Sequence, residues 1–107
     1  MTTQDSRDDD VLLWLEQWYG SQTNGEWEHE CGIRISTLDN PGWRVKIDLK
    51  DTELDGARLD RVVVERTDDD WIQCWTDGTT FNGAGGPSNL VELLNRFRSF
   101  AEQKKAS

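Results

Sequence analysis

One short segment gathers the residue types that chemistry most often uses. The run from Glu26 to Cys31 holds three glutamates, the only histidine of the chain and one of its two cysteines. Such a mixture is a candidate for holding a metal or activating a thiol. As a strand, however, the run places Glu28 and Glu30 on one face and His29 and Cys31 on the other, so no three-ligand set forms. We therefore expect an exposed acidic strand end, with no metal and no cofactor.

The two cysteines raise the question of a thiol-dependent reaction. Cys31 and Cys74 lack CxxC spacing and are too few for a disulfide framework, which indicates two reduced, partly buried thiols. A reactive cysteine needs an accessible, electropositive loop, and both residues fall inside predicted strands. The chain also has no Gly-x-Ser-x-Gly motif. We expect no enzyme, and a small cysteine-dependent enzyme such as a sulfurtransferase is the alternative.

A glycine-rich stretch, residues 82–89, precedes a predicted helix, where phosphate groups often bind. It matches neither the GxGxxG pattern of a βαβ unit nor the Walker lysine pattern. The surrounding sequence is acidic, which disfavours an anion. The simpler interpretation is a flexible loop in which glycines allow close packing on the sheet.

The elements that must position these residues follow from hydrophobic spacing. Apolar residues recur at helical intervals near both ends of the chain, which predicts helices over about 10–19 and about 89–103. Gly20 is a candidate end for the first helix, and Asn89 with Glu92 resembles a capping box for the second. Residues 1–7 are polar, and we expect them to be disordered.

Between the helices, alternation of apolar and polar residues predicts a sheet over about 27–82. The clearest alternation, Trp43–Leu49, marks the expected central strand. The fold class is therefore α+β: one domain over residues 1–107, with an antiparallel meander of about five strands and both helices packed on it. The expected strands are Trp27–Thr37, Trp43–Leu49, Val62–Glu65, Trp71–Thr76 and Thr79–Phe81.

Two tryptophans of the fourth predicted strand suggest a binding surface. Trp71 and Trp75 share one face of that strand, and Ile72 shares the other with Cys74. If Ile72 faces the helices, both indoles lie on the outer face of the sheet. The alternatives are that the tryptophan face is the buried one, or that a long loop covers it. In the first arrangement the indoles flank three cations and form a cation–π and binding surface; these cations are Arg34, Arg44 and Lys46.

Charge is the strongest compositional signal. The net charge is −9; residues 1–30 hold eight acids and one base, and residues 51–70 hold eight acids and three bases. This surface repels phosphate backbones, so we expect no nucleic-acid partner, and it attracts a basic protein. The simpler interpretation is that the acids keep a small domain soluble. No apolar run could span a membrane and no signal-peptide core is present, which predicts a cytoplasmic protein.

Several short strings bring a known family to attention. They extend from Trp14 to about Phe97, and the most specific is Leu38-Asp39-Asn40-Pro41-Gly42-Trp43. The others are Trp18-Tyr19, Gly25-Glu26-Trp27-Glu28-His29, Ile47-Asp48-Leu49, Thr52-Glu53-Leu54, and Gly85-Gly86-Pro87 with Asn89-Leu90. On these residues the chain resembles the bacterial immunity protein 53 family. The resemblance implies a cytosolic antidote, encoded beside a polymorphic toxin, that neutralises the toxin by binding it. It implies no catalytic or metal residue and does not say which residues touch the toxin.

The expected function is therefore toxin neutralisation through electrostatically assisted protein–protein binding, with a toxin domain that is basic. A general protein-interaction module without a toxin is a further alternative, and the oligomeric state is left open. The residues that we expect to contact the partner are Glu26, Glu28, Glu30, Arg34, Arg44, Trp71 and Trp75.

Overall fold

The structure, a computed structural model, describes residues 7–106 and consists of three helices and five strands. The earlier expectation for residues 1–7 falls outside the described part, apart from Arg7, which opens the first helix. In chain order the elements are α1 (Arg7–Gln22), α2 (Trp27–Glu30), β1 (Ile33–Leu38), β2 (Gly42–Asp48), β3 (Arg58–Glu65), β4 (Trp71–Asp77), β5 (Thr80–Gly85) and α3 (Leu90–Ala106).

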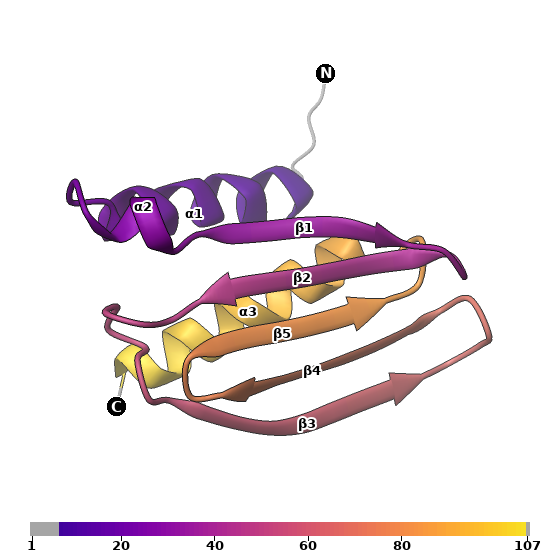
Figure 1. Ribbon diagram of the computed structural model, residues 1–107. Helices are drawn as coiled ribbons and strands as arrows, with labels where there is room; N and C mark the ends of the chain where they lie inside the picture. The colour runs from indigo at the N-terminus through magenta and orange to yellow at the C-terminus, as the bar shows by residue number, and fades with distance from the viewer. Residues whose placement is uncertain (1–6, 107) are drawn as a thin grey trace.

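All five strands form one antiparallel sheet with the order β1-β2-β5-β4-β3 (Figure 1). The expectation of a continuous meander is therefore wrong in one respect: β2 is an inner strand, but β5 occupies the middle. The segment between β2 and β3 explains the order. Two leucines of this segment, Leu49 and Leu54, are fully buried and anchor it in the hydrophobic core. Backbone N–H groups of Leu49 and Gly56 donate to the β4–β5 turn at Thr79 and Gly78, over 2.8 and 2.7 Å. The segment thus passes the end of the sheet to its far edge and leaves the middle position for β5.

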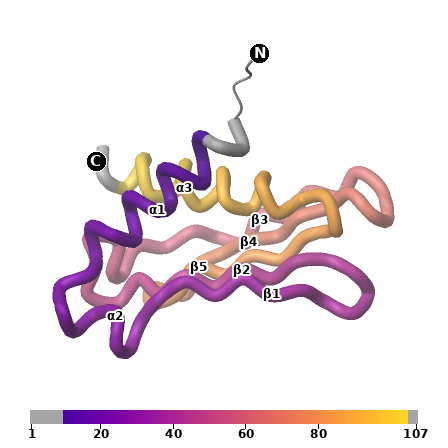
Figure 2. Tube along the Cα trace, turned by 90° about the horizontal axis from the view of Figure 1, so that it is seen from above, coloured from indigo at the N-terminus to yellow at the C-terminus, as the bar shows by residue number. Residues whose placement is uncertain are grey.

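Helices α1 and α3 lie on the same side of the sheet (Figure 2). Helix α3 contacts β4, β5 and α1, so the two helices form one layer over one face of the sheet. This arrangement buries the apolar stripe of each helix against an apolar sheet face. The predicted α+β class, with flanking helices and a five-stranded antiparallel sheet, is confirmed.

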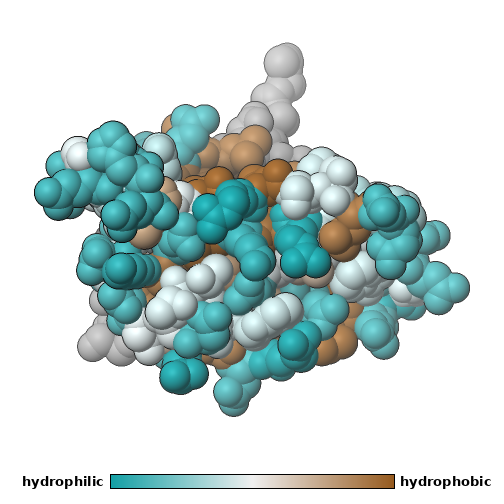
Figure 3. Space-filling model, in the orientation of Figure 1, coloured by the Kyte–Doolittle hydropathy of each residue, from teal (hydrophilic) through white to brown (hydrophobic). Residues whose placement is uncertain are grey.

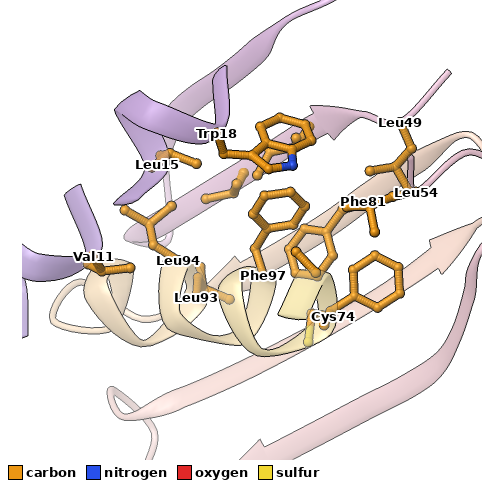
Figure 4. Close-up of a cluster of buried hydrophobic side chains, with 14 of the residues drawn as sticks. Val11, Leu15, Trp18, Leu49, Leu54, Cys74, Phe81, Leu93, Leu94 and Phe97 are labelled. Atoms are coloured by element: carbon orange, nitrogen blue, oxygen red, sulfur yellow. The ribbon is translucent and has the colours of Figure 1, made fainter. Parts of the chain in front are cut away.

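Phe97 of α3 is the centre of the core (Figure 4). Its ring lies 5.0 Å from Trp18, 5.1 Å from Phe81 and 5.8 Å from Trp14, in each case edge to face. Edge-to-face packing is the favoured geometry for aromatic pairs. These contacts join both helices to the central strand. The other buried apolar side chains around this cluster include Val11, Leu15, Val45, Ile47, Ile72, Cys74, Leu93, Leu94 and Phe100.

The prediction that the first strand begins at Trp27 is wrong. Residues Trp27–Glu30 form the short helix α2, and β1 begins only at Ile33. The side-chain Oδ1 of Asn24 accepts hydrogen bonds from the N–H groups of Glu26 and Trp27, both over 2.9 Å. The Trp27 indole is buried and donates to the carbonyl of Lys50 over 2.8 Å. These contacts turn the chain into a helical turn where the residue pattern indicated a strand.

Three further boundaries differ from the predicted ones. Helix α1 continues through Gly20 to Gln22, and β3 starts at Arg58. Strand β5 extends to Gly85, so residues 82–85 belong to the sheet and not to a flexible loop. Gly83 lies directly beneath α3, because a Cβ there would approach Leu93 to 3.2 Å. The glycines that suggested a loop therefore allow the helix to pack closely on the strand.

The predicted capping box at the start of α3 is also replaced by other contacts. The Asn89 amide donates to Asp70 over 2.9 Å and to Glu92 over 3.1 Å. Arg66 pairs with Glu92 over 2.7 Å, which ties the β3–β4 turn to the helix.

Within residues 7–106, no helix is long and apolar enough to cross a membrane.

Candidate functional site

The face of the sheet opposite the helices is uncovered over the part of the chain that the structure describes. Ile72 is 0% exposed and packs toward the helices, so its neighbours Trp71 and Trp75 point to the other side. The first of the two predicted arrangements is therefore the one observed. Figure 3 views this face and shows mainly hydrophilic and intermediate residues; the largest apolar patch lies beyond β1, toward α1, and smaller apolar patches lie at the right and at the lower edge. We call this surface the open sheet face.

Strand register places the open-face side chains in rows across the sheet. In one row Trp75 of β4 lies opposite Asn82 of β5, which lies opposite Lys46 of β2, which lies opposite Arg34 of β1. Antiparallel partners have Cβ atoms about 4.5–5.5 Å apart, so these side chains are direct neighbours. Asn82 thus lies between an indole and the Lys46 ammonium, and the second cation, Arg34, lies on the far side of Lys46.

The next row crosses the sheet in the same way and contains one cation and no indole. Val63 of β3, which is 52% exposed, lies opposite Gln73, followed in order by Ala84, Arg44 and Ser36. Together the two rows contain three cations, Arg34, Arg44 and Lys46, and no carboxylate. The short side chains of β5 lie between the indoles of β4 and the cations of β2.

Three of the six tryptophans use their indole N–H groups within the protein. Trp18, Trp27 and Trp43 each donate to a carboxylate or carbonyl of the protein. The indoles of Trp71 and Trp75, like that of Trp14 in α1, make no hydrogen bond within residues 7–106. Arg61 stacks on Trp75, with Cζ 4.0 Å from the ring centroid, and donates to Gln73 over 2.6 Å. Half-buried aromatic rings with a free donor are suited to contact a partner.

A polar pocket extends this surface beside Trp71. It has a volume of about 560 Å³ and is lined by Asn40 of the β1–β2 turn, by Glu65 at the end of β3 and by residues of the β3–β4 turn, among them Arg66. Two turns far apart in sequence therefore meet next to the indole. The open sheet face is thus continuous from β1 to β3.

The cations of the open face have unequal partners. Arg34 forms an ion pair with Asp48 over 3.4 Å, and Asp48 also accepts from the N–H of Gly32 over 2.9 Å. Arg44 and Lys46 have neither an ion pair nor a side-chain hydrogen bond within residues 7–106. Two cations of this face are therefore available to an external anion.

The predicted acidic contacts lie elsewhere, around α2. Glu26 and Glu30 are exposed and line a pocket of about 530 Å³ together with His29, Cys31 and Asp51. Glu28 has another role, because its carboxylate accepts from the N–H groups of Asn24 and Gly25 over 3.0 and 2.8 Å. Backbone hydrogen bonds lower the pKa of Glu28: the largest contribution comes from its own N–H group, followed by those from Asn24 and Gly25. The structure thus separates the predicted residues into an open face and an acidic end.

The chemistry of the two thiols disfavours a cysteine nucleophile. Burial, with a further contribution from Asp48, raises the pKa of Cys31, although this thiol shares a pocket with His29. Burial also raises the pKa of Cys74, which is 0% exposed in β4. The thiolate is the reactive form, so both shifts reduce reactivity. Cys31 follows α2 and precedes β1, so it does not lie inside a strand as predicted.

Within residues 7–106, no three or more His, Cys, Asp and Glu side chains are arranged to hold a metal ion. The glycines at 83 and 85 are buried in β5, which removes the open phosphate-binding loop that the sequence suggested.

A second surface was missed at the level of sequence. A groove of about 430 Å³ lies between α1 and β1, lined by Leu12, Leu15, Glu16, Tyr19, Gly32 and Ile33. Ile35 is 41% exposed and Tyr19 is 39% exposed. The sequence feature that could have indicated this groove is Leu12-Leu13, two leucines that lie off the apolar stripe of α1.

The five-stranded sheet with both long helices on one face defines a class: a small α+β domain whose other sheet face is open, polar and aromatic. The match to a known family narrows this class. The model of the family described as immunity protein 53 matches residues 12–102, and the chain belongs to this family. No curated protein and no solved structure is significantly similar to the chain. The family implies toxin neutralisation, and it identifies the chain as an immunity protein and not an enzyme.

Proposed function

We propose that this protein acts in the cytoplasm, where it binds a cognate toxin domain through the open sheet face and blocks the toxin without catalysing a reaction. Membership of the immunity protein 53 family supports the neutralising role. The observation that supports the surface is the placement of Trp71 and Trp75 on a sheet face that no described helix covers.

Interface energetics favour this face over the rest of the surface. Tryptophan and arginine are enriched among the residues that dominate binding energy, and they act best near the centre of a contact. Trp75 and Arg61 already stack, which holds both side chains in place before a partner arrives. A rigid sheet with ordered aromatic side chains loses little conformational entropy on binding. Such a preformed surface suits an antidote that must act quickly.

The acidic end contributes at longer range. The net charge of −9 favours the approach of a toxin with net positive charge, because electrostatic steering raises the association rate. Glu26 and Glu30 are exposed and have no ion-pair partner in the described structure, so they are the steering residues that we propose. Glu28 is engaged with backbone N–H groups, and we propose no direct contact for it.

The binding proposal is tested with the toxin domain encoded in the neighbouring reading frame. Replacing both indoles, Trp71→Ala with Trp75→Ala, should raise the dissociation rate, and the loss should reach about 2 kcal/mol or more if either is a central anchor. Surface plasmon resonance gives both rate constants, and protection of toxin-producing cells gives the functional result.

The matched control is Tyr19→Ala, which removes an exposed aromatic ring from the helix side of the molecule. Its kinetics should stay close to those of the unchanged protein. Full affinity of a folded tryptophan double variant would move the interface away from the open face. Absence of binding by the unchanged protein would reject the toxin as its partner.

A further inference from the structure

We infer that the part of the toxin that meets the open sheet face is acidic, and that Arg44 and Lys46 pair with its carboxylates. This inference rests on the proposed function, because it names the chemistry of the partner at that same surface. The contact patch of the toxin can be acidic although the toxin as a whole has a net positive charge.

The first observation is that cations are concentrated where the chain as a whole is acidic. The sequence has 21 acids and 12 bases. The two central rows of the open face nevertheless hold Arg34, Arg44 and Lys46 without a carboxylate. Local charge is therefore opposite in sign to the net charge.

The second observation is that this arrangement has an energetic cost. Lys46 lies directly opposite Arg34, and like charges in that position destabilise a sheet. Asp48 pairs with Arg34 but with neither Arg44 nor Lys46. Lys46 is half-buried and its ammonium has no acceptor among the described side chains. An anion supplied from outside would relieve this repulsion.

Solubility does not account for the cations. Acidic residues solubilise a surface at least as well as basic ones, and the chain uses acids for most of its surface charge. Lysines also guard sheet edges against unwanted pairing, but Arg44 and Lys46 belong to β2, which is paired on both sides. The sign and position of these charges therefore point to a partner.

The geometry suits a carboxylate with an apolar neighbour. Arg44 and Lys46 alternate on β2 and point to the same side, so one acidic segment can reach both. The neighbouring strand presents only Thr80, Asn82 and Ala84, short side chains that leave the cations accessible. Beyond them lie the indoles, against which an apolar side chain can pack. Arginine binds a carboxylate through two parallel hydrogen bonds, which adds directional specificity.

A phosphate backbone would also pair with these cations, so nucleic acid is the competing partner. The net charge of −9 opposes it, because a polyanion is repelled by the rest of the molecule. A protein can present an acidic patch while having a positive total charge. Its total charge is then attracted by Glu26 and Glu30, and its acidic patch pairs with the cations of the open sheet face. The acidic protein patch is therefore the partner that the charges favour.

The test reverses the two unpaired cations, Arg44→Glu with Lys46→Glu, in the full chain. Binding of the toxin domain should weaken roughly 30-fold or more, mainly through faster dissociation, because a desolvated ion pair becomes a repulsion. The loss should shrink as salt is raised. Lys46→Glu places a carboxylate opposite Arg34, so the urea midpoint should not fall.

The control variant, Lys50→Glu with Lys104→Glu, makes the same change in net charge at exposed positions away from the two rows. Its affinity should stay within a few-fold of the unchanged protein. Equal losses in both variants, or tighter binding by the face variant, would overturn the inference while leaving toxin binding established. Toxin that never binds the unchanged protein would reject the proposed function instead. Binding of short DNA or RNA strands that the face variant abolishes would assign the cations to nucleic acid and overturn the inference.

Discussion

Glu28 shows how a carboxylate in an acidic chain can serve the backbone instead of a partner. It closes the turn before α2 by accepting two backbone hydrogen bonds. Asp77 has the same role at the β4–β5 turn, where it accepts from the N–H groups of Thr79 and Thr80, both over 2.9 Å. These bonds lower the pKa of Asp77, and backbone hydrogen bonds likewise lower the pKa of Glu28. Such residues resemble binding residues in the sequence but have a structural role.

The depressed pKa of Glu28 predicts a pH-dependent contribution to stability. A carboxyl whose folded pKa lies below its unfolded value stabilises the fold above the unfolded pKa, and this contribution is lost as pH falls through the folded pKa. Glu28→Gln should therefore lower the urea midpoint at pH 7, and the difference from the unchanged protein should shrink as the pH falls below the ordinary glutamate pKa and through the lowered folded value. Denaturation curves from pH 7 to acid measure it.

Glu30→Gln is the matched control, because Glu30 is exposed and its carboxylate has no hydrogen-bond donor among the described residues. Its midpoint should follow that of the unchanged protein at every pH. A difference between Glu28→Gln and the unchanged protein that does not depend on pH would contradict the assigned role of the carboxylate.

At the scale of elements, the start of α3 depends on a close contact between two turns. Gly86 is buried beside the β3–β4 turn, and a Cβ there would overlap the carbonyl oxygen of Asp69. The N–H of Gly86 also donates to Trp71 over 3.0 Å. Arg66 and Asn89 bind the same turn to α3 through Asp70 and Glu92. The position of Trp71 on the open face therefore depends on this junction.

Two glycine-to-alanine variants should therefore change the stability of the fold in opposite directions. Gly86→Ala should destabilise the fold by about 1–3 kcal/mol, because the new methyl group must displace the backbone of Asp69. Gly20→Ala should stabilise it by about 0.5–1 kcal/mol, because Gly20 lies within α1 and a Cβ there meets nothing within 4 Å. Chemical denaturation measures both. A Gly86→Ala midpoint equal to that of the unchanged protein would show that the junction adjusts without cost.

At the scale of the whole molecule, charge acts by position. The exposed acids around α2 lie beyond one end of β1, whereas the cations lie within the sheet face (Figure 1). Charges outside a contact act mainly on the association rate and charges inside it mainly on the dissociation rate, so we expect the two groups to act at different stages of binding. The acids influence the approach, and the face influences the contact.

Reversing two acids tests the long-range stage. Glu26→Lys with Glu30→Lys should lower the association rate for a basic toxin at low salt and leave the dissociation rate nearly unchanged. The difference should disappear as ionic strength rises. Stopped-flow measurements at two salt concentrations are sufficient. An association rate that does not depend on salt would remove the steering role, and a faster dissociation would place Glu26 or Glu30 inside the contact.

Local patterns in the sequence determined the fold class. Apolar residues at helical spacing marked both long helices, and strict alternation over Trp43–Leu49 marked β2, because burial of one face imposes its period on the chain. The same alternation in Trp71–Thr76 showed that the two indoles share a face. The family strings, from Trp14 onward, indicated the immunity role that the family match confirms.

Only the tertiary structure decided which face of the sheet is covered, because alternation assigns two faces without saying where the helices lie. It also decided the strand order, which depends on how Leu49 and Leu54 anchor a connection between distant elements. The cation rows follow from that order: Lys46 meets Asn82 and Arg34 only because β5 pairs with β2. Net charge could not predict this patch, since a sum over the chain contains no information about neighbours in space. Helix α2 escaped prediction for the same reason, because the burial of Trp27 under Tyr19 and Trp18 is a contact between distant residues.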